Sequence, residues 1–223
     1  MIERIASFET TFNKQIALNY LLYLPADYEA QASTEFPLIL FLHGAGERGS
    51  DLENVKRLGL PGKLQNWTDC PFIVIAPQCP SDSVWVYHLD ALRALLDSVI
   101  ADFRVDVDRV YLTGMSLGGT GAWYLAGAFP DYFAALAPIC GHNTGRSHCT
   151  LFSHLPVWLF HGAKDIVVPV SESQSMAAAL RSLDANVRLT VYPDAGHDAW
   201  TPTYDDPELY AWFLQHRRAR SGK

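Results

Sequence analysis

The hydrophobic residues of this chain fall into two kinds of run. Short runs rich in β-branched and aromatic residues are typical of strands, and longer runs with apolar residues every three or four positions are typical of helices. The runs predicted as strands are Ile16–Leu24, Leu38–Leu42, Phe72–Ala76, Val110–Thr113, Ala134–Ile139, Val157–Phe160 and Val187–Tyr192, with Ile2–Phe8 as a weaker eighth candidate. The runs predicted as helices are His88–Phe103, Leu117–Phe129, Ser171–Leu183 and Pro207–Arg218.

The order of these runs predicts the layout of a sheet. Strands such as Leu38–Leu42 and Val157–Phe160 are apolar throughout, as strands are when helices cover both faces of a parallel sheet. The first strands follow one another without a helix, and regular alternation begins only after Leu42. We therefore predict an α/β fold with a mostly parallel sheet of about eight strands, an antiparallel N-terminal edge and helices on both faces. In such sheets, ligands bind beyond the carboxyl ends of the strands.

One helix start carries a sequence signature. Ser171 is followed three residues later by Gln174, which is a capping-box pattern. We therefore expect the Ser171 side chain to cap this helix.

Composition narrows the classes of function. The chain has 223 residues, 49% hydrophobic and 18% charged, with a formal charge of −7. This balance excludes disorder as the overall state and argues against nucleic-acid binding, which needs a basic surface. No run approaches the roughly 20 apolar residues of a membrane span. The first residues lack the apolar stretch of a secretory signal, so we expect a cytoplasmic location, with a secreted protein whose signal has been removed as the alternative.

The most specific motif follows the predicted strand Val110–Thr113. The residues Gly114-Met115-Ser116-Leu117-Gly118 form the pattern G-x-S-x-G between a strand and a helix. This pattern is the nucleophile elbow, a tight turn that presents a serine at a strand end and needs small residues two positions to either side. The N-terminus of the following helix directs partial positive charge at the same place. We predict that Ser116 is a catalytic nucleophile.

A serine nucleophile needs a base, and the base needs an acid that holds it in one tautomer. Asp165 follows the predicted strand Val157–Phe160, and His197 follows Val187–Tyr192, so both belong to the same sheet edge as Ser116. The order Ser, Asp, His along the chain is the one that the elbow fold uses. We therefore predict a catalytic triad of these three residues.

Other histidines and aspartates are weaker candidates for the triad. His43 and His161 end strands and precede glycine, which favours structural roles. Asp194 and Asp198 lie next to His197 in the sequence, and neither follows the preceding strand, where the orienting acid is expected.

A glycine-rich loop, His43–Gly49, follows the predicted strand Leu38–Leu42. Acyl transfer places negative charge on a carbonyl oxygen, and one well-aimed backbone N–H stabilises that charge by about 3–4 kcal/mol. We predict that the amides of Ala45 and Leu117 form the oxyanion hole, with Gly46 as the alternative to Ala45. The loop lacks the Gly-Lys-Ser/Thr ending of a phosphate-binding loop.

Four further side chains are predicted to contact a substrate: Gln78, Trp85, His142 and Trp200. Trp85 comes soon after a strand end, and Trp200 follows the predicted base by three residues. Aromatic walls suit an ester-binding pocket, and packing in the core is an equally good interpretation of both tryptophans.

The four cysteines allow one disulfide. Cys70 and Cys79 flank a predicted strand and would lie about 25–30 Å apart, too far for a bond. A bond between Cys140 and Cys149 across a loop remains open. We predict no metal site, because the spacing of the nearby histidines and cysteines matches no zinc pattern; the residues considered are Cys140, His142, His148, Cys149 and His154.

Together these motifs resemble those of the α/β-hydrolase superfamily. The resemblance is strongest to its small carboxylesterase- and phospholipase-like branch, which includes polyhydroxybutyrate-depolymerase-like, feruloyl-esterase-like and "predicted peptidase" proteins. The segments that carry it are His43–Gly49, Ala76–Cys79, Arg109–Gly119, His161–Asp165 and Gly196–His197. Dienelactone hydrolases share this fold but use a cysteine nucleophile, so Ser116 argues against that branch.

The resemblance implies hydrolysis of carboxylic esters through an acyl-enzyme, with a small-molecule ester as partner and no metal or organic cofactor. The site residues are spread from His43 to His197, so we expect one domain over residues 1–223. Only 17 residues separate Ile139 from Val157, too few for a cap domain, which favours small or exposed esters. The alternatives are a peptidase or acyltransferase with the same triad and a catalytically silent binding protein. Nothing in the sequence indicates an oligomeric state.

Overall fold

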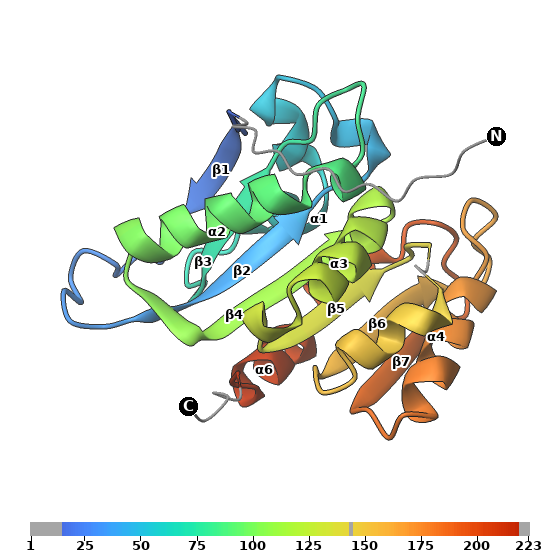
Figure 1. Ribbon diagram of the computed structural model, residues 1–223. Helices are drawn as coiled ribbons and strands as arrows, with labels where there is room; N and C mark the ends of the chain where they lie inside the picture. Colours follow the sequence, from blue (N-terminus) through green and yellow to red (C-terminus); the bar gives the residue numbers. More distant parts are fainter. Residues whose placement is uncertain (1–14, 143–144, 219–223) are drawn as a thin grey trace, which may run out of the picture.

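Seven strands form one twisted sheet at the centre of the molecule (Figure 1). The computed structural model describes residues 15–142 and 145–218. The strands are β1 (Tyr20–Tyr23), β2 (Phe36–Leu42), β3 (Ile73–Pro77), β4 (Val105–Met115), β5 (Ala135–Ile139), β6 (Val157–Gly162) and β7 (Val187–Tyr192). Their order is β1-β3-β2-β4-β5-β6-β7. Only β1 runs antiparallel to its neighbour, and the other pairs are parallel.

This arrangement confirms the predicted α/β class and the antiparallel N-terminal edge. The predicted number of about eight strands is wrong, because the described residues form seven. The eighth candidate, Ile2–Phe8, lies outside the described residues.

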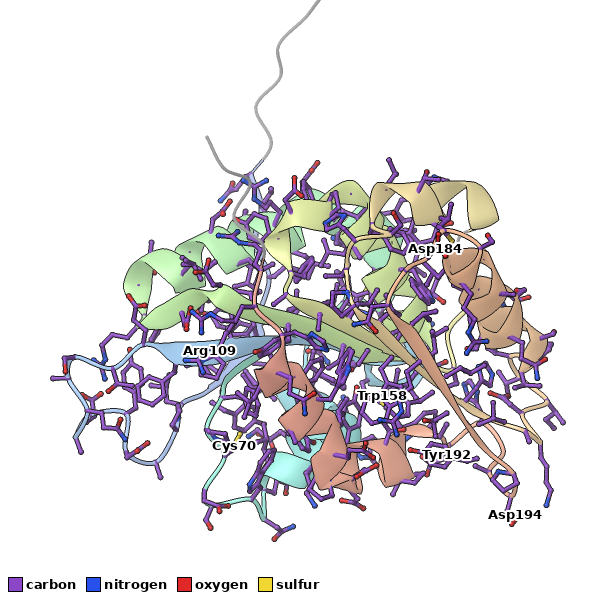
Figure 2. All side chains as sticks on the ribbon, turned by 90° about the horizontal axis from the view of Figure 1, so that it is seen from below. Cys70, Arg109, Trp158, Asp184, Tyr192 and Asp194 are labelled. Carbon is purple, nitrogen blue, oxygen red and sulfur yellow. The ribbon has the colours of Figure 1, made fainter. Side chains whose placement is uncertain are left out.

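Helices cover both faces of the sheet, as predicted, and each face has its own core. One core includes side chains of α2 (Leu89–Asp102), α3 (Leu117–Ala128) and α4 (Ser171–Arg181). The other includes side chains of α1 (Gly59–Leu64), α5 (Trp200–Asp205) and α6 (Pro207–Gln215). Trp158 of β6 belongs to the second core, on the side of the sheet seen in Figure 2.

The structure contradicts the predicted helix cap at Ser171 and answers the open question of a disulfide between Cys140 and Cys149. Val170 already has helical dihedral angles, so Ser171 lies inside the first turn of α4 and its side chain makes no capping bond. Cys140 and Cys149 are both buried, and neither is part of a disulfide. Cys149 Sγ instead lies 3.0 Å from Met176 Sδ in the core.

The segment between β5 and β6 is the one considered for a cap domain. In the described part of the segment between β5 and β6, the helical structure is confined to the 3-10 helix η5 (Arg146–Leu151). Among the described residues, no helix has the length and apolar character that crossing a membrane requires.

Candidate active site

Three parallel strands deliver the predicted triad to one edge of the sheet. Ser116 follows the last residue of β4, Asp165 lies in the loop after β6, and His197 lies in the loop after β7. Because β4, β6 and β7 run in the same direction, their carboxyl ends meet at this edge.

The turn at Ser116 is strained and needs two glycines. Ser116 has φ 54° and ψ −115°, a conformation that L residues rarely adopt outside such elbows. A Cβ atom on Gly118 would lie 1.9 Å from the Leu42 carbonyl oxygen, and one on Gly114 would lie 2.4 Å from the Gly118 oxygen. The two glycines therefore allow the start of α3 to approach the strand ends closely.

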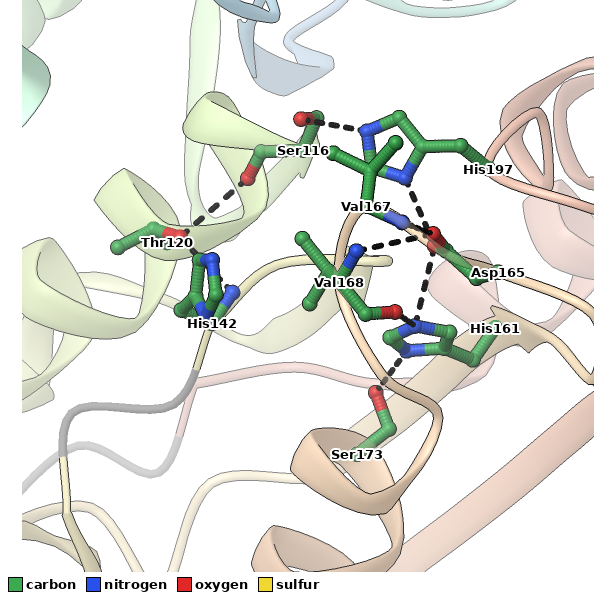
Figure 3. Close-up of polar contacts among 9 residues, drawn as sticks. All are labelled: Ser116, Thr120, His142, His161, Asp165, Val167, Val168, Ser173 and His197. Carbon is green, nitrogen blue, oxygen red and sulfur yellow. Dashed lines mark hydrogen bonds and ion pairs between the residues drawn. The ribbon is translucent and has the colours of Figure 1, made fainter.

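A continuous chain of hydrogen bonds links the three side chains (Figure 3). Ser116 Oγ lies 2.9 Å from His197 Nε2, and His197 Nδ1 lies 2.7 Å from Asp165 Oδ2. An ionised carboxylate only accepts, so Nδ1 carries the ring proton. Nε2 is then free to accept the hydroxyl proton of Ser116, which is the geometry that activates a serine.

Asp165 is held in its ionised form by its surroundings. The amides of Val167 and Val168 each donate to Oδ1 at 2.9 Å, while His197 donates to Oδ2. Burial alone would raise the pKa of Asp165, but these hydrogen bonds outweigh it and hold the pKa below its usual range. A negative charge beside Nδ1 stabilises the imidazolium that forms when Ser116 loses its proton.

His161 supports this acid and was not predicted to do so. The ring is fully buried, with Nε2 donating to the Val168 carbonyl at 2.9 Å and lying 3.3 Å from Asp165 Oδ2. Its Nδ1 accepts from Ser173 Oγ at 2.7 Å. His161 therefore fixes the loop that carries Asp165, and the only sequence signal was its position at a strand end before glycine.

The two competing aspartates have other partners. The Asp194 side chain is 91% exposed, forms an ion pair with Lys164 and lies at the outer tip of the loop after β7 (Figure 2). The Asp198 carboxylate accepts hydrogen bonds from the amide and hydroxyl of Thr201 in the first turn of α5. Neither is bonded to His197 in the way that Asp165 is.

The predicted oxyanion amides begin two helices near Ser116. Leu117 is the first residue of α3, and Ala45 is the first residue of the 3-10 helix η1 (Ala45–Glu47). N–H groups in the first turn of a helix have no acceptor within the helix, so such amides can bind an external anion. Gly46, the alternative donor, lines the same cavity as Ala45.

A cavity of about 290 Å³ opens directly over Ser116 and His197. Its other walls combine the glycine-rich loop with apolar side chains; they are Gly44, Ala45, Gly46, Glu47, Leu58, Met115, Val167 and Trp200. The Trp200 ring meets the His197 ring edge to face, with 5.4 Å between ring centres. Trp200 therefore lies on the cavity wall beside His197, and its contact with a substrate stays a prediction.

The structure places the other three predicted substrate contacts elsewhere. Gln78 is buried and donates to the Glu47 and Asp51 carbonyls at 2.8 Å each. Trp85 is fully buried, and its Nε1 donates to the His43 carbonyl at 3.0 Å. These two side chains lie behind the glycine-rich loop instead of on the cavity wall.

His142 is also away from the cavity wall. It is exposed, and its amide donates to Thr120 Oγ1 at 3.0 Å (Figure 3). The expectation that it contacts substrate rested on its loop position alone, which does not determine where the ring points.

One group of side chains has the spacing of a metal site. Among the described residues, potential ligand atoms of Cys140, Asp165 and His197 lie within 4.8 Å of one another. Burial raises the pKa of the Cys140 thiol to about 12, so the thiol stays protonated. Metal ligation needs a thiolate, and the other two side chains are already bonded to each other. The arrangement therefore favours acid–base chemistry over metal binding.

The nearby residues considered from the sequence have other partners as well. Cys149 packs against Met176 in the core, and His154 lies 3.7 Å from the Asp131 carboxylate at the surface.

The sheet topology, the elbow and the hydrogen-bonded triad together define an α/β-hydrolase. A comparison with family models makes the assignment narrower, because the model described as "Dienelactone hydrolase family" matches residues 85–210, more than half of the chain. The protein belongs to this family. The expectation that a serine nucleophile argues against the dienelactone hydrolase branch was therefore wrong, since the match extends over the fold around the site and does not depend on one side chain.

Individual proteins similar to this chain have names that describe esterases, depolymerases or acylamino-acid-releasing enzymes. The solved structure described as "Crystal Structure of a Thermostable Esterase" is 31% identical, has a TM-score of 0.78, and covers 90% of this chain and 60% of its own. Poly(3-hydroxyoctanoate) depolymerase of Pseudomonas fluorescens is 29% identical over 70% of this chain and 63% of its own. Acylamino-acid-releasing enzyme 2 of Oryza sativa subsp. japonica is 27% identical over 82% of this chain and 31% of its own.

The matches cover only part of the length of each curated relative. This chain spans between a third and a half of the length of the first of them. Their whole-protein activities therefore bear on this chain only as proposals.

Proposed function

We propose that the protein is a serine carboxylesterase that hydrolyses small or exposed carboxylic esters through an acyl-enzyme. The observation that carries this proposal is the chain of hydrogen bonds from Ser116 through His197 to Asp165, at 2.9 Å and 2.7 Å, on the wall of an open cavity. The name of the esterase structure with 31% identity points the same way.

The proposed reaction has two halves, and the geometry of the triad supports the first. Ser116 Oγ attacks the ester carbonyl carbon while His197 Nε2 takes the hydroxyl proton. The carbonyl oxygen becomes an oxyanion, which the amides of Ala45 and Leu117 stabilise. His197 then gives its proton to the leaving alcohol, and the acyl group remains on Ser116. In the second half, water attacks the acyl group while His197 takes a proton from the water. His197 then returns the proton to Ser116 Oγ, and the carboxylic acid leaves.

A substitution of the nucleophile tests the proposal. Ser116→Ala should lower kcat for a short p-nitrophenyl ester by roughly four to six orders of magnitude, with the fold unchanged by circular dichroism. Ser182→Ala, which removes an exposed serine at the C-terminal end of α4 and outside the cavity lining, is the matched control and should keep the parent rate. A Ser116→Ala variant with near-parent activity would refute the mechanism.

A peptidase is the second candidate, because the similarity to an acylamino-acid-releasing enzyme covers 82% of this chain. The same triad would then cleave an amide. Comparing kcat/KM for an N-acetyl amino-acid p-nitroanilide and for the p-nitrophenyl ester of the same acid separates the two. The ester should be cleaved faster by at least two orders of magnitude, and comparable rates would favour the peptidase.

A further inference from the structure

Three consecutive carbonyls of the glycine-rich loop each accept a hydrogen bond from a side chain. Trp85 Nε1 donates to the His43 carbonyl at 3.0 Å, and Arg48 Nε donates to the Ala45 carbonyl at 3.0 Å. Between them, His43 Nδ1 lies 2.7 Å from the Gly44 carbonyl. Hydrogen bonds from side chains therefore fix three consecutive peptide groups of the loop that supplies the proposed oxyanion amide.

The hydrogen bonds of His43 define its tautomer. The backbone amide of Cys79 donates to Nε2 at 3.0 Å, because an amide N–H cannot accept. The Gly44 carbonyl can only accept, so the proton must be on Nδ1. Neutral His43 with Nδ1–H satisfies both partners, and neither the other tautomer nor the cation does.

The surroundings keep the ring neutral. His43 is fully buried and meets Trp85 edge to face, with 4.9 Å between ring centres. The pKa of His43 is lowered to about 4, mainly by burial; the hydrogen bond to Gly44 opposes this shift, and the nearby positive charge of Arg48 adds to it. The neutral ring, in which Nε2 can accept from the Cys79 amide while Nδ1–H donates to Gly44, is therefore present throughout the neutral pH range.

The position of this bond matters because of peptide geometry. The Gly44 carbonyl and the Ala45 N–H belong to the same planar peptide group, and in a trans peptide they point in opposite directions. The ring holds the carbonyl on the core side, so the Ala45 N–H is turned towards the opposite side, where Ala45 lines the cavity with Ser116. A hydrogen bond to the carbonyl also polarises the amide and makes its N–H a stronger donor.

We propose that His43 is the positioning residue of the oxyanion hole. A line of hydrogen bonds runs from the Cys79 amide through the His43 ring to the Gly44–Ala45 peptide, and fixes the Ala45 N–H against the substrate oxyanion. This inference rests on the proposed esterase function and extends it from the triad to the loop.

Two substitutions distinguish the roles of the two ring nitrogens of His43. In His43→Asn the side-chain amide can take the place of Nδ1 and still donate to the Gly44 carbonyl. In His43→Gln the amide reaches the place of Nε2, so the Cys79 bond is kept and the bond to Gly44 is lost. His43→Gln should lower kcat by roughly 10- to 100-fold with KM within about threefold, and His43→Asn should stay within about fivefold of the parent kcat.

An inhibitor that mimics the tetrahedral intermediate provides a second measurement. The inhibition constant of an alkyl boronic acid should rise in His43→Gln by the same factor by which kcat/KM falls. A purely structural role would instead lower the apparent kcat in proportion to the folded fraction and leave the inhibition constant unchanged. Equal kcat for His43→Gln and the parent, with both folded, would overturn the proposal.

Arg48→Met is the matched comparison within the loop. Arg48 holds the next peptide group, whose N–H belongs to Gly46. If the Ala45 amide is the oxyanion donor, Arg48→Met should lower kcat by a smaller factor than His43→Gln does. A larger loss in Arg48→Met would assign the oxyanion to Gly46 and overturn the role of His43.

The parent protein allows a test without any substitution. The ¹⁵N shifts of His43 at pH 7 should show a protonated Nδ1 and an unprotonated Nε2, and the reverse tautomer would overturn the proposal. The esterase assay keeps the two proposals distinct. A parent inactive towards esters refutes the proposed function, whereas an active parent with an unaffected His43→Gln variant refutes only the role of His43.

Discussion

Two buried side chains near the site, Asp165 and His43, have their ionisation set in opposite ways. Asp165 accepts hydrogen bonds from two amides and His197, which favours the charged form. His43 donates to one backbone group and accepts from another within an apolar core, which favours the neutral form. Asp165 therefore stays charged beside His197, and His43 stays neutral beneath the glycine-rich loop.

The neutral state of His43 predicts a pH dependence of stability. Its pKa is about 4 in the folded protein and 6.5 when exposed, so the unfolded chain binds an extra proton between these values. The free energy of unfolding should therefore fall by on the order of 3 kcal/mol as the pH drops from about 6.5 to 4. Above pH 6.5, this group should have no effect.

Urea unfolding of the parent and of His43→Asn at pH values from 7.5 to 4.5 measures the contribution of His43 to the pH dependence of the free energy of unfolding. The difference between the two should shrink on acidification, since the variant lacks the titrating group. His154→Asn, at an exposed histidine, should follow the parent curve. Parallel curves for the parent and His43→Asn would show that His43 does not titrate abnormally.

Single residues also show which parts of the site could be predicted from the sequence. Ser116, Asp165 and His197 could be predicted because each follows a strand, and parallel strands place their ends together. Gln78 and Trp85 also lie near strand ends, but their side chains point behind the loop. Their direction depends on which backbone carbonyls need donors, and that is decided only when distant segments pack.

At the scale of elements, the close approach of α3 to β2 is the feature on which the elbow depends. Gly118→Ala would place a Cβ atom 1.9 Å from the Leu42 carbonyl, where only backbone could yield. We expect this substitution to lower the free energy of unfolding by several kcal/mol and to abolish activity. Gly127→Ala in the same helix meets only ordinary contacts, the nearest at 3.7 Å, and should be neutral or stabilising by up to about 1 kcal/mol.

Thermal unfolding followed by circular dichroism compares the two glycine variants directly. A Gly118→Ala protein as stable as Gly127→Ala would mean that α3 can move away from β2 without cost.

The elements that escaped prediction are short or interrupted by charge. α1 and α5 have six residues each, too few for a helical repeat of apolar positions to appear. β4 begins at Val105, five residues before the predicted start, although Asp106, Asp108 and Arg109 break the apolar run. Phe36 pairs with Val105 next to an irregularity in register, so the extension depends on β2 and not on local pattern.

At the scale of the molecule, the size of the cavity predicts the preferred substrates. About 290 Å³ beside Ser116, with Leu58, Val167 and Trp200 as apolar walls, suits a short acyl chain. In a series of p-nitrophenyl esters, kcat/KM should be highest from acetate to butyrate and fall towards decanoate. Trp200→Ala should move the optimum to longer chains, and Leu151→Ala, at an exposed residue outside the cavity lining, should leave it unchanged. A rise in kcat/KM up to decanoate would contradict the cavity assignment.

Covalent labelling tests most directly whether this fold assembles a serine nucleophile. The purified protein should react with a fluorophosphonate probe at one site per chain, and mass spectrometry of the digested adduct should place the label on Ser116. Ser116→Ala should remain unlabelled under the same conditions. An unlabelled parent, or a label retained in Ser116→Ala, would contradict the account.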